Sequence, residues 1–326
     1  MEHHPEIGPQ TGPVPQGRPP LTQPHMPDAA AGVFHSGFAA LVGRPNVGKS
    51  TLLNALMGQK LSIVTPRPQT TRHRILGILN VPGAQVAFVD TPGLHHHASR
   101  ALNKAMNRTA ASALADADLV VHVIEALRWT EEDDLVLERI KQAGRPALLV
   151  VNKVDKAHPR ERLLPFMQEM THRHEYLEYV PISALKAEHV VELAKVIVAH
   201  LPQGQPMFPQ GEVTDKSDAF RISEAIREKL MLELNQEVPY GIAVEIERMN
   251  ESEDGRLEVD AAIWVDREGQ KPIVIGAGGE RLKRVGRAAR LALNEQLGRR
   301  LHLNLWVKVR ENWADNARAL QELGLQ

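Results

Sequence analysis

The sequence predicts an α/β fold for the first two thirds of the chain and a smaller α+β domain after it. Between residues 35 and 203, short β-rich runs alternate with helical stretches, which is typical of a mainly parallel sheet covered by helices. Beyond residue 213 the predicted order changes to helix, strand, strand, helix and strand. A run with three prolines and two glycines, residues 201–213, separates the two patterns. We therefore place the domain boundary there.

Six strands are predicted in the first domain, with helices between most of them. The strand candidates are rich in aliphatic and β-branched residues: FAALVG, RILGILN, QVAFVD, DLVVHVIE, PALLVV and EYVPIS. The helical stretches are residues 49–57, 100–114, 131–143, 160–172 and 188–200. The second domain is predicted to contain helix 218–235, strands 241–248 and 257–265, a short helix, a glycine turn, a basic helix at 280–297 and strand 302–309.

The chain thus divides into five predicted segments. The first is a proline-rich extension that we expect to be disordered, because residues 1–32 hold eight prolines and few large apolar residues. The last is an amphipathic tail that we expect to pack rather than to bind a ligand. The predicted boundaries are 1–34 for the extension, 35–203 for the first domain, 204–213 for the linker, 214–311 for the second domain and 312–326 for the tail.

Composition excludes several classes of protein. The chain has no cysteine, which rules out disulfides, thiolate metal sites and cysteine nucleophiles. No run approaches the roughly 18 apolar residues of a membrane span, and the N-terminus lacks a signal-peptide pattern, so we expect a cytoplasmic protein. The net charge of −1 hides a segregation, because residues 280–310 carry nine Lys/Arg against two Glu, leaving −8 on the rest. This basic run indicates a polyanionic partner.

The run GRPNVGKS, residues 43–50, matches the phosphate-binding loop pattern and lies between a predicted strand and a predicted helix. Its glycines let backbone N–H groups surround phosphates, while Lys49 can reach the β- and γ-phosphates and the Ser50 hydroxyl suits Mg²⁺. The predicted phosphate-binding residues are Gly43, Arg44, Pro45, Asn46, Val47, Gly48, Lys49, Ser50, Thr51 and Gly93.

Two later segments are predicted to respond to the γ-phosphate. Asp90 ends a strand and begins DTPG, where a carboxylate can hold Mg²⁺ through water and the Gly93 N–H can meet the γ-phosphate. A threonine of TPRPQTTRHR can ligate Mg²⁺ only while the γ-phosphate is present; Thr70 and Thr71 are both candidates, and we favour Thr71. The predicted switch residues are Thr70, Thr71, Asp90, Thr91, Pro92 and Leu94, and the predicted Mg²⁺ ligands are Ser50, Thr71 and Asp90.

The NKVD run, residues 152–155, predicts recognition of guanine. The Asp155 carboxylate can accept hydrogen bonds from guanine N1–H and the exocyclic amine, and adenine would leave it unpaired. The predicted guanine-binding residues are Asn152, Lys153, Asp155, Ser183, Ala184 and Leu185.

Leu94 follows DTPG at a position where many small GTPases carry a glutamine that orients the attacking water. Slow intrinsic GTP hydrolysis is therefore expected.

The run VIGAGGERLKRVGRAAR, residues 274–290, places a glycine turn before a basic helix. A second nucleotide pocket is disfavoured, because no Lys-Ser/Thr pair follows these glycines. A Gly-x-x-Gly turn that presses single-stranded RNA backbone against the domain fits better. The predicted RNA-binding residues are Gly276, Ala277, Gly278, Gly279, Arg281, Lys283, Arg284 and Arg287.

The ordered set GRPNVGKS, QTTRH, DTPGLH, NKVD and SAL, followed by VIGAGGERLKRVG and LWVKVRENWADN, closely resembles the Era family of bacterial GTPases. The resemblance covers about residues 35–326. It implies a Ras-like P-loop GTPase domain followed by a type II KH domain that binds the 3′ end of 16S ribosomal RNA and assists assembly of the 30S subunit.

The resemblance also implies the cofactors and partners. Mg²⁺ is expected with GTP or GDP, and a K⁺ ion is expected near Asn46, because an asparagine at that loop position helps to hold potassium in related GTPases. We expect a monomer. A membrane-associated signalling GTPase, bound peripherally at the inner membrane, stays as the alternative function. A tRNA-modifying GTPase would carry a C-terminal cysteine and a tandem GTPase a second phosphate-binding loop, and this sequence has neither.

Overall fold

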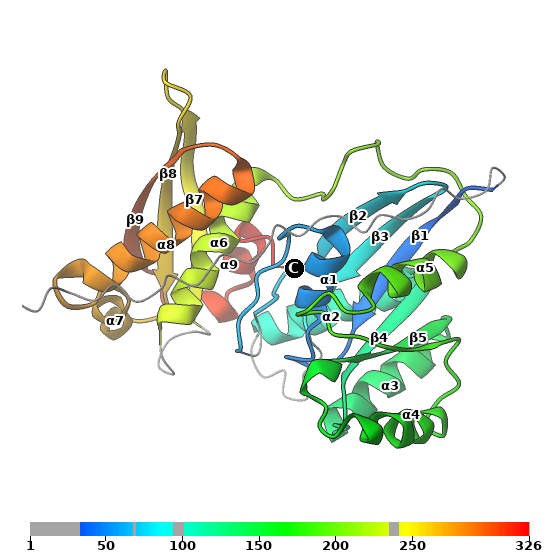
Figure 1. Cartoon of the computed structure of the whole chain (residues 1–326). Coiled ribbons are helices and arrows are strands. Elements are labelled where there is room, and N and C mark those ends of the chain that lie inside the picture. Colours follow the sequence, from blue (N-terminus) through cyan, green and yellow to red (C-terminus); the bar gives the residue numbers. More distant parts are fainter. Residues whose placement is uncertain (1–32, 68–69, 94–100, 235–240, 326) are drawn as a thin grey trace, which may run out of the picture.

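The computed structural model describes residues 33–67, 70–93, 101–234 and 241–325, which form two domains that pack against each other (Figure 1). Nearly all of the predicted N-terminal extension and Leu94 lie outside the described residues. In the described part of the chain, one domain is built on a six-stranded sheet and the other on a three-stranded sheet. The predicted change of architecture near residue 213 is therefore observed.

The sheet of the first domain has the strand order β2-β3-β1-β4-β5-β6. All neighbouring strands are parallel except β2 and β3, which form an antiparallel pair. Parallel strands place their carboxyl ends at one edge, which is where ligands bind in such sheets. The strands are β1 (His35–Val42), β2 (Ile75–Val81), β3 (Ala84–Asp90), β4 (Leu119–Glu125), β5 (Ala147–Asn152) and β6 (Tyr179–Pro181).

Helices cover both faces of this sheet. Because successive side chains of a strand point to opposite faces, neighbouring residues of β1 lie in different cores. Leu41 packs in a core with α1 and α5, whereas Ala40 and Val42 pack in a second core with α2, α3 and α4. Both faces are apolar, as expected for a parallel sheet buried on two sides. The helices are α1 (Lys49–Met57), α2 (Ala101–Asp116), α3 (Glu131–Ala143), α4 (Leu163–Thr171) and α5 (Val190–Ala199).

The second domain places its helices on one face of a mixed sheet. β7 and β8 are antiparallel, and β8 and β9 are parallel because α7 and α8 form the crossover between them. One core joins this sheet to α6 and α8. The elements are α6 (Asp218–Glu233), β7 (Ile242–Glu251), β8 (Leu257–Val265), α7 (Lys271–Ile275), α8 (Glu280–Leu297) and β9 (Leu301–Val309).

The linker and the tail both make tertiary contacts. The Gln85 side chain of β3 accepts hydrogen bonds from the N–H groups of Met207 and Phe208, so the linker lies along the first domain. The tail, which ends in α9 (Ala317–Glu322), buries Trp313 in a core shared with α2 and β8. The predicted packing role of the tail is thus observed, and the tail packs against both domains.

Candidate functional site

The phosphate-binding loop connects β1 to α1 and surrounds the buried side chain of Lys49. The Lys49 ammonium donates to the carbonyl oxygens of Gly43 (2.8 Å) and Arg44 (3.0 Å). Gly48 has a φ of +105°, and a Cβ there would lie 2.4 Å from the Asn152 side-chain nitrogen, so only glycine fits. Burial lowers the pKa of Lys49 to about 8, partly opposed by Asp90. A polyphosphate would supply the missing counter-charge.

Two predicted phosphate-binding residues point their side chains away from the loop interior. Arg44 is buried and pairs with Glu125 (2.8 Å) and Asp133 (3.0 Å) behind the loop. Val47 lies wholly in the hydrophobic core. These residues can meet a phosphate only through their backbone, and their side chains instead hold the loop in place.

The three predicted Mg²⁺ ligands are brought together. The Ser50 hydroxyl donates to Asp90 Oδ2 at 2.7 Å and lies 2.8 Å from the Thr71 hydroxyl. Asp90 is fully buried, and its Oδ1 atom has no hydrogen-bond partner among the described residues. Burial raises the pKa of this carboxyl, against the opposing effect of Lys49. The other carboxylate oxygen, Oδ2, also accepts from the Ser62 hydroxyl at 2.9 Å. Carboxylate and hydroxyl oxygens gathered in this way suit a hard cation.

The two candidate threonines differ in what their hydroxyls contact. The Thr70 hydroxyl bonds within its own loop, to the Thr65 hydroxyl (2.6 Å) and the Arg67 carbonyl (2.8 Å). Only the Thr71 hydroxyl faces Ser50. Thr91 also points away, since its hydroxyl donates to the Leu41 carbonyl at 2.9 Å.

Asn152 ties together the three loops of the predicted guanine site. Its side chain donates to the Val47 carbonyl (2.8 Å) and accepts from the Ala184 N–H (3.0 Å). The Ser183 hydroxyl in turn donates to Asp155 Oδ1 at 2.6 Å, which aims the carboxylate. NKVD, SAL and the phosphate-binding loop are distant in sequence, yet one amide side chain sets their spacing.

A cavity of about 470 Å³ joins these parts. Predicted residues that line it include Asn46, Lys49, Ser50, Thr71, Gly93, Lys153 and Leu185. Sequence reasoning missed the lining residues Ile63, Val64, Thr65, Pro66, Arg67 and Lys156. It also missed Glu125, which pairs with both Arg44 and Lys153. The position of Glu125 at the carboxyl end of a parallel strand could have revealed it.

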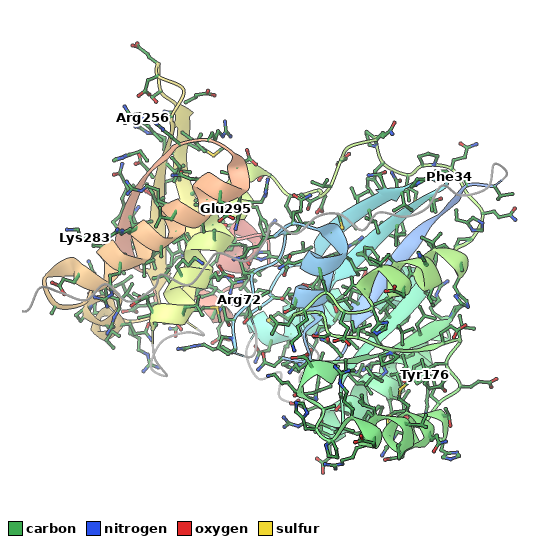
Figure 2. All side chains as sticks on the ribbon, viewed as in Figure 1. Phe34, Arg72, Tyr176, Arg256, Lys283 and Glu295 are labelled. Atoms are coloured by element: carbon green, nitrogen blue, oxygen red, sulfur yellow. The ribbon has the colours of Figure 1, made fainter. Side chains whose placement is uncertain are left out.

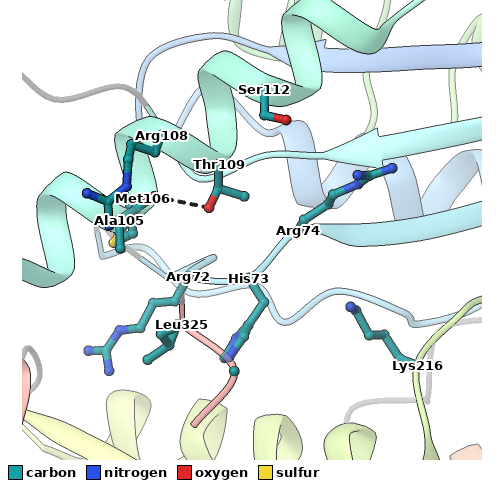
Figure 3. A pocket seen from close by; sticks show the side chains of 11 residues that line it. Arg72, His73, Arg74, Ala105, Met106, Arg108, Thr109, Ser112, Lys216 and Leu325 are labelled. Carbon is teal, nitrogen blue, oxygen red and sulfur yellow. Dashed lines mark hydrogen bonds between the residues drawn. The ribbon is translucent and has the colours of Figure 1, made fainter. Parts of the chain in front are cut away.

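A second cavity, of about 360 Å³, lies between α2, the segment after Thr71 and the C-terminus (Figure 3). Arg74 and Arg108 lie on its lining, but Figure 3 shows their side chains directed away from each other. The dashed contact there joins the Thr109 hydroxyl to the Ala105 carbonyl within α2. The described residues that line this cavity do not form a convergent set of polar groups, and none of the predicted phosphate- or guanine-binding residues is among them.

The predicted RNA-binding turn lies between α7 and α8. Gly276 has a φ of +78°, and a Cβ there would lie 2.6 Å from the Arg281 Cβ, so this glycine is required by the fold. Ala277 and Gly278 are exposed at the tip. Arg281 donates to the Ile273 carbonyl and thereby braces the turn.

A groove of about 480 Å³ runs beside the turn, between α8 and β9. Gly279, Lys283 and Arg287 line it, whereas Arg284 instead pairs with Glu233 at 3.2 Å. Figure 2 shows Lys283 on the outer side of α8, far from Arg72, which lies where the domains meet. The groove is also lined by residues that the sequence did not predict: Leu282, Gly286, Arg290, Leu303 and Leu305. Helical spacing of residues 283, 287 and 290 could have placed Arg290 on this face.

Comparisons with known proteins match both domains of the chain. The model of the 50S ribosome-binding GTPase family matches residues 38–153, and the KH-domain model matches residues 237–314. A GTPase Era from Marinobacter nauticus is 46% identical over 305 residues, which cover 94% of this chain and 98% of the relative. The chain belongs to the Era family of GTPases. An Era protein from Stenotrophomonas maltophilia is 49% identical over 90% of this chain and 98% of its own length.

Solved Era structures have the same two-domain fold. Aquifex aeolicus Era bound to GDP and AlF₄⁻ superposes with a TM-score of 0.87 at 41% identity, covering 90% of this chain and 99% of that chain. An Era solved with MgGDPNP and nucleotides 1506–1542 of 16S ribosomal RNA gives a TM-score of 0.86, also at 41% identity and with the same coverage. The predicted Ras-like GTPase domain followed by a KH domain is thereby confirmed. None of the helices in the described part of the chain is both long and apolar enough to cross a membrane.

Proposed function

We propose that this GTPase of the Era family acts as a switch that binds the 3′ end of 16S ribosomal RNA and assists 30S subunit assembly. The observation that carries the proposal is the presence, in one chain, of a cavity lined by the phosphate-binding loop and Lys153 and of a basic groove beside a glycine turn. A relative with the same fold was solved with both kinds of ligand. We also propose the domain boundaries and site residues predicted from the sequence.

The GTP site is built from three loops, namely the phosphate-binding loop, NKVD and SAL. The loop N–H groups and Lys49 face the phosphates, while Asp155 accepts from guanine. The Ala184 N–H donates to the Asn152 side chain and so helps to hold the loop beside the base. Since Ser183 already donates to Asp155, the carboxylate is oriented before the base arrives. This preorganisation supports GTP over ATP.

Ser50, Thr71 and Asp90 would hold Mg²⁺. The unpartnered Asp90 oxygen and the two adjacent hydroxyls fit this role, and the Thr71 contact supports Thr71 over Thr70 as the switch threonine. When bound, Mg²⁺ would neutralise charge on the β- and γ-phosphate oxygens. Leu94 lies outside the described residues, so slow intrinsic hydrolysis stays a prediction of the sequence.

A potassium ion is proposed beside Asn46. Asn46 lines the cavity, has a φ of +63°, and donates through its side-chain nitrogen to the Pro66 carbonyl at 3.2 Å. A cation there would add positive charge at the phosphates without an arginine from a partner. We expect hydrolysis to be several-fold faster in KCl than in NaCl; equal rates would remove this proposal.

Binding of the intact chain to RNA tests the function. A labelled oligonucleotide with the 16S 3′-end sequence should bind more tightly than a scrambled one, and GTP should be hydrolysed in the same preparation. Equal binding of both oligonucleotides would reduce the groove to a general polyanion site. A membrane-associated signalling role and a monomeric state stay predictions of the sequence, and no observation in the described structure favours the former.

A further inference from the structure

A second-domain helix, α6, holds the switch segment of the first domain at two points. Arg227 donates from Nη2 to the carbonyl oxygen of Thr70 at 2.6 Å. The next residue of the helix, Glu228, accepts through its carboxylate from the Val64 N–H at 3.0 Å and from Lys60 at 2.5 Å. The two contacts lie at Val64 and Thr70, and Thr71 follows directly after the second one. The loop that lines the nucleotide cavity is thus attached to the other domain.

The Arg227 guanidinium is itself rigidly held. It forms a two-pronged pair with Glu224 through Nε (2.7 Å) and Nη2 (2.6 Å), and its side chain is only 3% exposed. Burial raises the pKa of Glu224, but Arg227, together with His73 and Arg72, lowers it below its usual value. Such bidentate pairs fix geometry as well as charge. Thr70 therefore meets a donor with little freedom of its own.

The contact extends to the predicted Mg²⁺ site through one peptide plane. Because the peptide bond is planar, fixing the Thr70 carbonyl also fixes the N–H and Cα of Thr71. The Thr71 hydroxyl then lies 2.8 Å from Ser50, which bonds to Asp90 at 2.7 Å. A buried chain of contacts thus runs from Glu224 to Asp90 across the domain boundary.

We propose that Arg227, supported by Glu224, is a positioning residue for GTP hydrolysis that sets the place of the Thr71 hydroxyl from the second domain. The inference rests on the proposed role of Thr71 as the switch threonine. The inference predicts that Arg227 stabilises the complex that contains a γ-phosphate and Mg²⁺, because the proposed role of Thr71 as a Mg²⁺ ligand applies only to that complex. Binding of GDP should not depend on Arg227.

Two variants avoid leaving Glu224 buried without a partner, which would unfold the interface. Arg227→Lys keeps the charge, but an ammonium cannot reproduce the fork that reaches both Glu224 and Thr70. The double variant Glu224→Leu/Arg227→Met replaces the pair by apolar groups of similar size. Arg221→Lys is the matched control, because Arg221 lies on the same helix and donates to Asp218 of that helix rather than to the first domain.

The experiment measures binding of MgGDPNP and of GDP to each variant. Loss of one charge-assisted hydrogen bond should weaken MgGDPNP about tenfold and raise the Mg²⁺ concentration needed for hydrolysis, with GDP affinity within about twofold. Arg221→Lys should change neither. An equal loss of affinity for MgGDPNP and GDP, or no loss for either, would overturn the inference. A contact that merely joins the domains would not affect the binding of one nucleotide more than that of the other.

A double-mutant cycle separates this inference from the proposed function. If Arg227 acts through Thr71, then Arg227→Lys should add less than about twofold to the effect of Thr71→Ala. Additive effects would show that Arg227 acts elsewhere and would overturn the inference alone. If Thr71→Ala leaves MgGDPNP binding unchanged, the proposed role of Thr71 is wrong, and the inference fails with it.

Discussion

The nucleotide pocket and the groove beside the glycine turn differ in how many of their polar groups are already engaged. Lys49, Asn152 and Asp155 all have hydrogen-bond partners in the first domain. In the groove, Lys283 and Arg287 are exposed, and neither forms a hydrogen bond or ion pair with the described residues. Buried and prearranged groups select one ligand by leaving any other unpaired. Exposed cations attract a polyanion by charge and leave selection to shape.

The largest expected effect comes from removing the phosphate-facing charge of the pocket. Lys49→Met keeps the buried stem of the side chain but removes the ammonium, and GTP hydrolysis should fall by at least about 100-fold. RNA binding should stay within about twofold, since the groove lies in the other domain. Steady-state GTPase assays and RNA filter binding on the same protein measure both. A comparable loss of RNA binding would contradict the separation of the two sites.

Asp155→Asn tests whether the pocket selects guanine through hydrogen bonds to the Asp155 carboxylate. The amide loses one acceptor and should weaken GTP about 100-fold while favouring XTP, whose base offers a carbonyl in place of the amine. Competition binding with GTP, XTP and ATP gives the three affinities. Ser183→Ala is a useful companion, because it removes only the donor that aims Asp155 and should weaken GTP less. Unchanged preference for GTP would take Asp155 out of base recognition.

The groove should respond to charge at its turn. Ala277→Asp/Gly278→Asp places two carboxylates where RNA backbone approaches, and single-stranded RNA binding should weaken about tenfold or more, with GTP binding unchanged. A Cβ at Gly278 meets open space, but φ is +58°. Gly278→Asn is therefore the matched control, since asparagine tolerates this conformation and adds no charge. Retained RNA binding in the double variant would make the turn merely structural.

Proton linkage gives the smallest of these effects. The pKa of Lys49 without nucleotide is lowered to about 8 by burial, and phosphates raise it again. GTP binding should thus be constant below about pH 8 and weaken above it by up to tenfold per pH unit, as a proton is taken up. Calorimetry in buffers of different ionisation enthalpy counts that proton. Affinity that is flat from about pH 7.5 to 9.5 would show that Lys49 stays charged without nucleotide.

Local patterns predicted most of the fold and the nucleotide site. Helix 280–297 and strand 257–265 are observed with the predicted bounds. The phosphate loop, Asp90 and NKVD follow strands of a parallel sheet, so topology alone brings them to one edge. The cavity residues Val64 and Arg67 were not predicted, because residues 61–67 show no hydrophobic periodicity. The hydrogen bond from Arg227 to Thr70 could not be predicted from local patterns, because it depends on how the two domains dock. The only indication in the sequence is that charged residues lie on the apolar face of this helix.

The hydrogen bond from Val64 to Glu228 makes one backbone amide a reporter of domain separation. Val64 belongs to no strand or helix, and its N–H bonds to a carboxylate of the other domain at 3.0 Å. Its exchange with deuterium therefore requires that the two domains part, at least locally. The protection factor of this single amide, measured with GDP and with a GTP analogue bound, would give the free energy of domain opening in each nucleotide state.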